Sequence, residues 1–284
     1  MTTQHPTEGH NNQLGNQTNS ALNNQKALMM TARPLDGKHR GKVAALVSSP
    51  ITHPITGKQA GFYLGELCHA KFIFCEAGYE VDIYSTEGGN VVWDEHSDPN
   101  TGEMGSHDLL SAGFLSRELF KTKLKNTKPL TSLNPDDYVA IWMAGGQAPS
   151  ITFRNNPVLE KVLAKFHEQG KGIGAVCHGT AALLSARDSS GNFIIKGKKW
   201  TGFTDEEEKA LEKKTGTKNQ PYWIESEARK IPDTHFFAGE PFQQHAIRDG
   251  SLVTAQQQNS ALLGAQLLME AIHASQVKFL GDAK

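Results

Sequence analysis

Short apolar runs and amphipathic stretches alternate along most of the chain. Residues 42–47 form a compact apolar run that predicts a buried strand. Residues 62–77 have the apolar spacing of a helix and stop at Gly78, a residue typical of the position after a helix. A second apolar run over residues 80–84 predicts the next strand. The core of the protein therefore begins in the order strand, helix, strand.

The same alternation returns in the second half of the chain. Residues 138–143 are continuously apolar, as in a strand that is buried on both faces of a parallel sheet. Asn156 and Pro157 are typical of the N-cap and first residue of a helix, and Gly170 is typical of its end. The remaining predicted elements are a strand over 173–176, a strand over 252–254 and an amphipathic helix over 260–274. This alternation predicts an α/β fold, a doubly wound, mostly parallel sheet flanked by helices, with functional groups at the carboxyl ends of the strands.

Three stretches depart from the pattern. Residues 1–25 contain ten Asn or Gln and almost no large apolar side chains, so we expect residues 1–38 to form an extension outside the core. Residues 90–135 and 188–238 are polar or charged and predict inserts that form a small cap. The remainder, residues 39–284, is expected to be a single α/β domain.

Composition narrows the class of protein. The 284 residues carry a formal net charge of −1, which makes nucleic acid and anionic membranes poor candidate partners. No apolar stretch approaches the length of a membrane span. The three cysteines are odd in number and lack the spacing of a metal site, so we expect a reducing cytoplasm and no metal. We also expect no cofactor, since the paired glycines Gly145 and Gly146 lack the spacing of a dinucleotide fingerprint.

Cys177 is the most informative residue. It follows a short apolar strand and precedes a helix rich in small residues, so it lies on a sharp turn. Such a turn needs small neighbours on both sides of the nucleophile, and Ala175 and Gly179 meet that need. Free N–H groups at the start of a helix favour a thiolate. The alternative is a buried structural cysteine, but the adjacent His178 favours a nucleophile.

Two further features have a functional and a structural interpretation. Glu66 lies at the head of the apolar stripe of its helix, where it would point inward with a raised pKa and act as an acid or base. A first-turn glutamate exposed to water is the alternative. Gly145 and Gly146 follow a predicted strand, so their N–H groups could form an oxyanion hole, or they could serve an ordinary turn.

The acidic run Glu206-Glu207-Glu208 has the same ambiguity. Thr204 or Asp205 could cap a helix there, with Glu207 or Glu208 completing a capping box. One of the glutamates could instead turn inward and orient His178, which needs a partner to hold its tautomer.

Together these motifs resemble the ThiJ/PfpI superfamily over residues 42–274. The resemblance rests on the Cys177 turn, Glu66 in the first helix, the Met-Ala-Gly-Gly-Gln segment, the Thr-Gly-Phe-Thr-Asp-Glu-Glu-Glu segment and Asp-Gly-Ser-Leu-Val-Thr near residue 250. It implies a flavodoxin-like, class I amidotransferase-like fold. The chain length and its extra segments resemble the larger members, stress chaperones and glyoxalase III enzymes that convert methylglyoxal to D-lactate without glutathione or metal.

The resemblance also implies roles for individual residues. The nucleophile falls on Cys177, its histidine on His178, the first-helix glutamate on Glu66 and the acidic partner of the histidine on Glu208. The chain departs from the family pattern at Ala144, Gln147 and Thr180, all beside the implied pocket.

The primary hypothesis is a glyoxalase-type lyase that acts on a small aldehyde through Cys177, with Gly145 and Gly146 holding the developing oxyanion. A holdase chaperone that binds unfolded client proteins is one alternative. A cysteine hydrolase or amidotransferase-like protein is another, although no His-x-Glu pair follows Cys177. A cytoplasmic homodimer is expected in each case.

Overall fold

A computed structural model describes residues 40–101 and 107–281. The extension predicted for residues 1–38 lies outside the described residues. No helix in the described ranges is long and apolar enough to cross a membrane.

The centre of the molecule is a seven-stranded sheet in the order β10-β11-β7-β6-β1-β4-β5. All neighbouring pairs are parallel except β10 and β11, which run antiparallel. The strands of the sheet are, in chain order, β1 (Lys42–Val47), β4 (Glu80–Ser85), β5 (Lys128–Pro129), β6 (Ala140–Met143), β7 (Gly172–Val176), β10 (Ala246–Asp249) and β11 (Leu252–Ala255). The prediction of a mostly parallel α/β sheet is confirmed.

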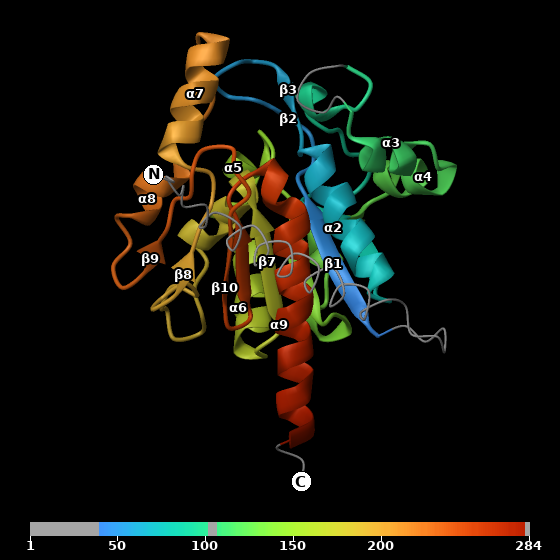
Figure 1. Cartoon of the computed structure of the whole chain (residues 1–284), viewed down its shortest axis with the longest axis vertical. Helices are drawn as coiled ribbons and strands as arrows, with labels where there is room; N and C mark the ends of the chain where they lie inside the picture. Colours follow the sequence, from blue (N-terminus) through green and yellow to red (C-terminus); the bar gives the residue numbers. More distant parts are fainter. Residues whose placement is uncertain (1–39, 102–106, 282–284) are drawn as a thin grey trace, which may run out of the picture.

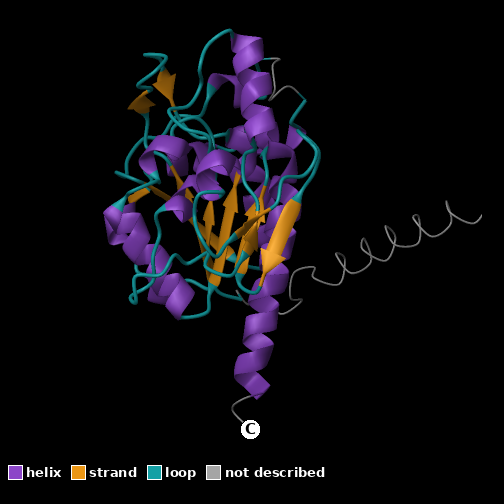
Figure 2. Ribbon diagram, turned by 90° about the vertical axis from the view of Figure 1, so that its left-hand side faces the viewer, coloured by secondary structure: helices purple, strands orange, loops and turns teal. Residues whose placement is uncertain are grey.

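Helices cover both faces of this sheet. α2 and α9 pack against each other on one face, and α6 lies on the other (Figures 1 and 2). The helices are α2 (Leu64–Glu76), α3 (Leu109–Leu115), α4 (Glu118–Lys125), α5 (Pro149–Thr152), α6 (Pro157–Glu168), α7 (Asp205–Thr215), α8 (Ile224–Ala228) and α9 (Ala261–Gly281). α6 begins as predicted, because the Asn156 side chain accepts hydrogen bonds from the N–H groups of Val158 and Leu159, both at 3.1 Å.

Two strands of the sheet were not predicted. β5 pairs with the end of β4 through Tyr84 and Lys128, so the segment 90–135 returns to the sheet instead of staying wholly outside it. β10 forms a hairpin with β11 at the opposite edge. Both are short edge strands without a continuous apolar run, because at most one face of each is covered.

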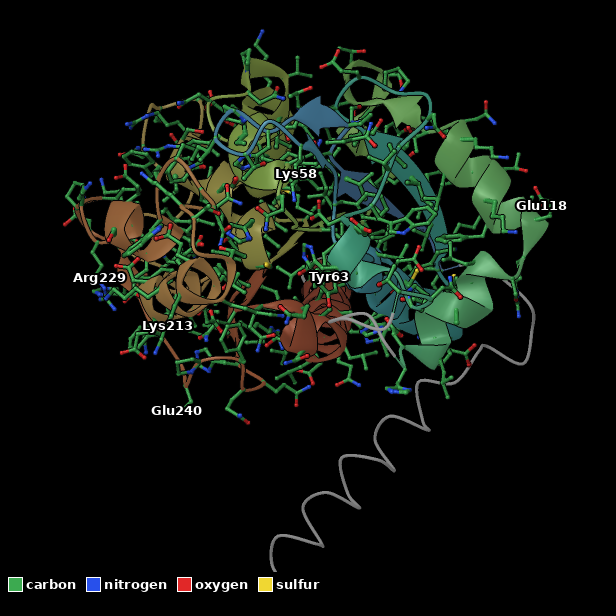
Figure 3. The ribbon with its side chains drawn as sticks, turned by 90° about the horizontal axis from the view of Figure 1, so that it is seen from above. Lys58, Tyr63, Glu118, Lys213, Arg229 and Glu240 are labelled. Atoms are coloured by element: carbon green, nitrogen blue, oxygen red, sulfur yellow. The ribbon has the colours of Figure 1, made fainter. Side chains whose placement is uncertain are left out.

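Short elements gather beyond the end of β1, at the upper edge of the sheet in Figure 1. They include the hairpin of β2 (Ile51–Thr52) and β3 (Gln59–Ala60). A small parallel pair, β8 (Lys199–Trp200) and β9 (His235–Phe236), lies beside α8. Seen from above, Tyr63 at the start of α2 lies near the centre, whereas Glu118 and Arg229 lie at the rim (Figure 3). The β2–β3 hairpin thus lies beyond the end of β1, whereas β8 packs beside the edge strand β10.

Candidate active site

Cys177 lies on a strained turn at the end of β7. Its φ of 56° falls in the left-handed region that side chains rarely adopt. The helix predicted to follow it is present, and it is a 3₁₀ helix, η4 (Cys177–Leu184). The hydroxyl of Thr180 donates to the Cys177 carbonyl at 2.7 Å, which secures this first turn. The departure from the family pattern at Thr180 thus supports the turn directly.

Glycines leave room for this turn. A Cβ added at Gly145 would lie 2.9 Å from the Cβ of Cys177 and 2.7 Å from the His178 nitrogen. One added at Gly179 would lie 2.5 Å from the Met143 carbonyl oxygen. Larger residues at either position would push β6 and the turn apart.

The imidazole of His178 lies between a thiol and a carboxylate. Its Nδ1 is 3.4 Å from the Cys177 sulfur, and its Nε2 is 2.8 Å from Oε1 of Glu208. The ring stacks on Phe203, with centroids 4.4 Å apart. Because a carboxylate only accepts, Glu208 holds a proton on Nε2 of His178 and leaves Nδ1 facing the sulfur.

The acidic run divides into two environments. Glu207 completes a capping box with Thr204, and it also accepts hydrogen bonds from the Phe242 N–H at 2.8 Å and from the Gln256 amide at 2.9 Å. Glu208 is equally buried, and its Oε1 is hydrogen-bonded to His178. Glu206 is exposed. Both interpretations of the run therefore apply, to adjacent residues.

Glu66 points inward and is fully buried. Its Oε2 accepts a hydrogen bond from the Gly145 N–H at 2.6 Å, and the Trp142 indole donates to its backbone carbonyl at 3.0 Å. Burial raises the pKa of the carboxyl from 4.5 to about 8, although the Gly145 N–H and the Cys177 thiol each lower it. Glu66 is thus largely protonated at pH 7 and ionises within reach of neutral pH.

The Gly145 N–H, predicted as a donor of an oxyanion hole, is hydrogen-bonded to Glu66 instead. It donates a hydrogen bond to the Glu66 side chain, so it positions that carboxyl group and is not free for a substrate oxygen. Gly146 has a φ of 116°, and a Cβ there would lie 2.4 Å from the Tyr63 nitrogen. Its backbone conformation and close contact both require glycine.

The Cys177 thiol is less acidic than the sequence argument predicted. Burial raises its pKa well above the ordinary value, and the charge of Glu66 raises it further, while the His178 backbone N–H lowers it. A 3₁₀ turn in a buried site does not compensate for that desolvation. The expectation of a resting thiolate is therefore wrong, because the sulfur is only 3% exposed and lies beside a carboxyl group.

Two polar residues in this region were missed by the sequence analysis. Asp94 is buried, and its two oxygens accept hydrogen bonds from the Gly61 N–H at 2.9 Å and the Gln147 N–H at 2.7 Å. Burial raises the pKa of Asp94, whereas His178 lowers it. His53 is also buried; burial lowers the pKa of its ring, and the nearby charges of Asp94 and His178 shift that pKa as well. Neither residue has a spacing that marks it, since each lies in a loop without periodicity.

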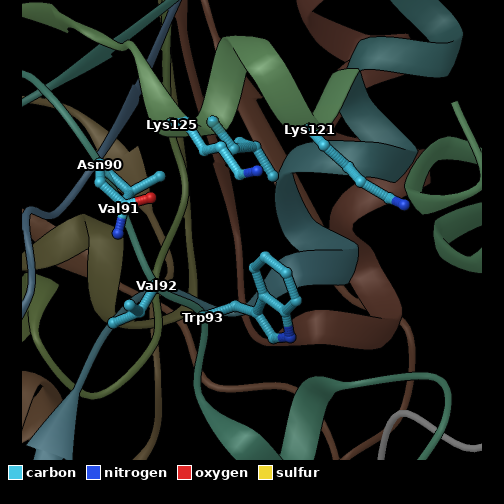
Figure 4. Close-up of a pocket in the computed structure, with 7 residues that line it drawn as sticks. Asn90, Val91, Val92, Trp93, Lys121 and Lys125 are labelled. Atoms are coloured by element: carbon cyan, nitrogen blue, oxygen red, sulfur yellow. The ribbon is translucent and has the colours of Figure 1, made fainter. Parts of the chain in front are cut away.

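A separate cavity lies away from this cluster. It has a volume of about 270 Å³ and lies between residues 90–93 and α4, with Trp93, Leu124 and Lys125 in its wall (Figure 4). It contains none of the predicted site residues. Among the described residues, no group of three or more His, Cys, Asp or Glu side chains is placed to hold a metal ion.

We call Glu66, Cys177, His178 and Glu208 the reactive cluster. It brings a thiol, an imidazole with a fixed tautomer and a carboxyl of raised pKa together in a buried site. These groups suit nucleophilic addition to a small electrophile followed by proton transfer near neutral pH. The low exposure of the sulfur favours small substrates.

Comparison with known proteins covers the same region. A model of the DJ-1/PfpI family matches residues 61–271. Glyoxalase 3 of Candida albicans is 30% identical over 233 residues, which are 81% of this chain and 98% of that protein. Among solved structures, Rapid Encystment Protein 24 KDa of Francisella tularensis aligns with a TM-score of 0.75 at 26% identity, covering 82% of this chain and 99% of that one. The crystal structure of glyoxalase III from Candida albicans aligns with a TM-score of 0.69 at 28% identity, covering 82% and 98%. The range that the family model matches, residues 61–271, includes the positions of all four members of the reactive cluster.

Proposed function

Because the chain belongs to the DJ-1/PfpI family, we propose that it is a glutathione-independent, glyoxalase-type lyase. Its substrates would be 2-oxoaldehydes such as methylglyoxal, and its product from methylglyoxal would be D-lactate. Relatives named Glyoxalase 3, from Candida albicans, and glutathione-independent glyoxalase HSP31, from Saccharomyces cerevisiae, support the assignment. The observation that carries it is the buried carboxyl of Glu66, with a pKa near 8, beside the Cys177 thiol.

The first step is addition of the thiol to the aldehyde. A bond forms between the Cys177 sulfur and C1, and the C1=O electron pair moves to oxygen. The thiol proton is relayed to that oxygen by His178, whose Nδ1 faces the sulfur at 3.4 Å. The product is a hemithioacetal. Glu208 stabilises the imidazolium that forms transiently, because its carboxylate lies 2.8 Å from Nε2.

The second step is an isomerisation. Glu66 in its ionised form removes the proton from C1, the electron pair forms a C1=C2 double bond, and the C2 oxygen takes up a proton from water to give an enediol. The protonated Glu66 then returns that proton to C2, while the C1 hydroxyl gives its proton back to the hydroxide left by the water. C1 is thereby oxidised and C2 reduced, with no external oxidant, and a lactate thioester results.

Water completes the cycle. It adds to the thioester carbonyl, the C–S bond breaks, and the thiol proton is restored to Cys177. We propose the backbone N–H of Gly146 as an oxyanion donor in this step, since Gly145 is engaged by Glu66. The sum of the steps is methylglyoxal plus water giving lactate.

The test is lactate formation from methylglyoxal without glutathione. Cys177→Ser should abolish turnover, because an alcohol is a far poorer nucleophile than a thiol near neutral pH. A wild-type protein that forms no lactate would contradict the assignment. A Cys177→Ser variant that retained turnover would contradict the role of the thiol.

A holdase chaperone is the second candidate. Leu109 and Leu119 are 83% and 73% exposed on α3 and α4, and apolar side chains of this kind could bind unfolded clients. Protection of a heated client protein by both wild type and Cys177→Ser would favour this role.

The homodimer and the cytoplasmic location remain predictions, to be tested by light scattering after gel filtration and by cell fractionation.

A further inference from the structure

The cavity beside α4 has the size and lining of a site for a small molecule. Val91 and Leu124 are the buried part of its lining, at 3% and 2% exposed, and the lysines at its rim are exposed. Its volume of about 270 Å³ equals that of about nine waters in the liquid. The cavity therefore has room for a ligand of about ten non-hydrogen atoms.

Backbone hydrogen bonds join the two sides of the cavity. The Val91 N–H donates to the carbonyl of Leu124 on α4 at 3.0 Å. Next to this contact, Gly89 and Thr127 exchange two backbone hydrogen bonds, each of 2.9 Å. Residues 90–93 are thus tied to the end of α4, and the cavity between them is formed without a ligand, as most small-molecule sites are.

Trp93 provides a flat apolar wall. Its indole N–H donates to a carboxylate oxygen of Asp98 at 2.9 Å, so the polar edge of the ring already has a partner. The ring lies across the cavity from α4, which contributes Leu124 (Figure 4). An aromatic ring in the ligand would pack favourably between these two side chains.

Two lysines make the α4 side of the cavity positive. Lys121 and Lys125 are four residues apart, so they lie on one face of the helix. Lys121 has only a surface ion pair with the exposed Glu118, at 3.7 Å, and such pairs are weak. The ammonium group of Lys125 has no ion pair or hydrogen bond with any residue in the described ranges. Lys125 is therefore available to an anionic group.

We propose that this cavity binds a small carboxylate that carries an apolar group the size of a phenyl ring. The apolar group packs between Trp93 and Leu124, and the carboxylate lies at Lys125 with Lys121 beside it. Both parts of the ligand are needed, because an ion pair at the surface contributes little by itself. No member of the reactive cluster lines the cavity, so the proposal is independent of the lyase activity.

The probe is hydrocinnamate, which joins a phenyl ring to a carboxylate through two methylene groups. Its binding to the full-length protein is measured by isothermal titration calorimetry, with the uncharged hydrocinnamamide as its isostere. The wild type should bind the acid with a Kd of about 1 mM or lower, and the amide at least about fivefold more weakly. D-lactate has a carboxylate without an apolar ring, so it should not displace hydrocinnamate.

Three variants locate the bound probe. Lys125→Gln keeps much of the side-chain stem and removes the charge, so the affinity for hydrocinnamate should fall about fivefold to tenfold. Lys123→Gln is the matched control, because Lys123 is exposed in the same last turn of α4 and does not line the cavity. Lys123→Gln and Cys177→Ser should both bind hydrocinnamate as the wild type does.

Several results would overturn the proposal. They are a wild type that does not bind hydrocinnamate, an amide that binds as tightly as the acid, displacement by D-lactate, or equal affinities of Lys123→Gln and Lys125→Gln. Loss of binding in Cys177→Ser would place the probe in the reactive cluster and overturn it too. A wild type that binds hydrocinnamate as expected but forms no lactate would refute the proposed lyase and leave this site standing.

Discussion

Replacing Glu66 by Gln should separate the reactivity of the thiol from catalysis. The change keeps the shape of the side chain, and its amide oxygen can still accept from the Gly145 N–H, as Oε2 does at 2.6 Å. The amide cannot ionise or transfer a proton. Because positioned acid–base groups contribute about 10²–10⁴-fold to a rate, lactate formation should fall by that factor.

Alkylation of Cys177 should respond in a different way. At pH 7 the carboxyl of Glu66, with a pKa near 8, is mostly neutral, so Gln resembles it and the labelling rate should stay within about threefold. Above pH 8 the wild type gains a negative charge beside the sulfur, and a neighbouring charge shifts a pKa by about 1–3 units. At pH 9 the Glu66→Gln variant should therefore react with iodoacetamide at least about tenfold faster than wild type.

The assay is the pH dependence of Cys177 labelling, followed by mass spectrometry, beside lactate formation on the same samples. Glu206→Gln is the control, because Glu206 is exposed on the same acidic run as Glu208. If labelling and lactate formation fell together at every pH, Glu66 would act by activating the thiol, and the reasoning from its raised pKa would be refuted.

Three further predictions follow from the same geometry. The folded pKa of Glu66, about 8, exceeds its ordinary 4.5, so the folded wild type holds the extra proton and loses stability as pH rises between these values. Chemical denaturation at pH 5 and at pH 9 should show Glu66→Gln gaining up to about 4 kcal/mol relative to wild type, and a constant difference would contradict this. Glu208→Gln should lower lactate formation with little change in Tm. Glu207→Gln should instead lower the free energy of unfolding by about 1–3 kcal/mol, because an amide cannot accept all the hydrogen bonds that Glu207 accepts. If Glu207→Gln lost activity and Glu208→Gln lost stability, the roles of the two residues would be exchanged. Gly145→Ala should abolish activity and lower Tm, because the added Cβ would lie 2.9 Å from that of Cys177, and an unchanged Tm would show that β6 moves freely at this point.

Features encoded within a few neighbouring residues were predictable from the sequence. β1 and α6 follow from apolar runs and an Asn-Pro helix start, and the inward direction of Glu66 follows from its place on the apolar stripe of α2. The contact of His178 with Glu208 joins residues thirty positions apart, and spacing alone offered three glutamates for it. The family resemblance, not periodicity, selected Glu208.

The features that were not predictable from the sequence depend on how loops that are distant along the chain pack together at the end of the sheet. His53 and Asp94 lie close enough to His178 for its charge to shift their pKa values, because packing brings the β2–β3 hairpin and the segment after Val92 to this end of the sheet. The raised pKa of Cys177 likewise depends on how completely the surrounding segments bury the sulfur. Desolvation is a property of the whole assembly, so local helix-terminus arguments gave the wrong direction.

The tight packing around the turn at Cys177 also bears on how related sequences should be interpreted. Glycine at positions 145 and 179 is demanded by backbone atoms and a Cβ less than 3 Å away, whatever side chain the turn presents. A relative that has lost all catalysis would still keep these glycines, because the fold itself selects them. Only the residue at 177 and the partners of its side chain carry information on chemistry, so an intact glycine framework with another residue at 177 marks a protein that kept the architecture and gave up the reaction.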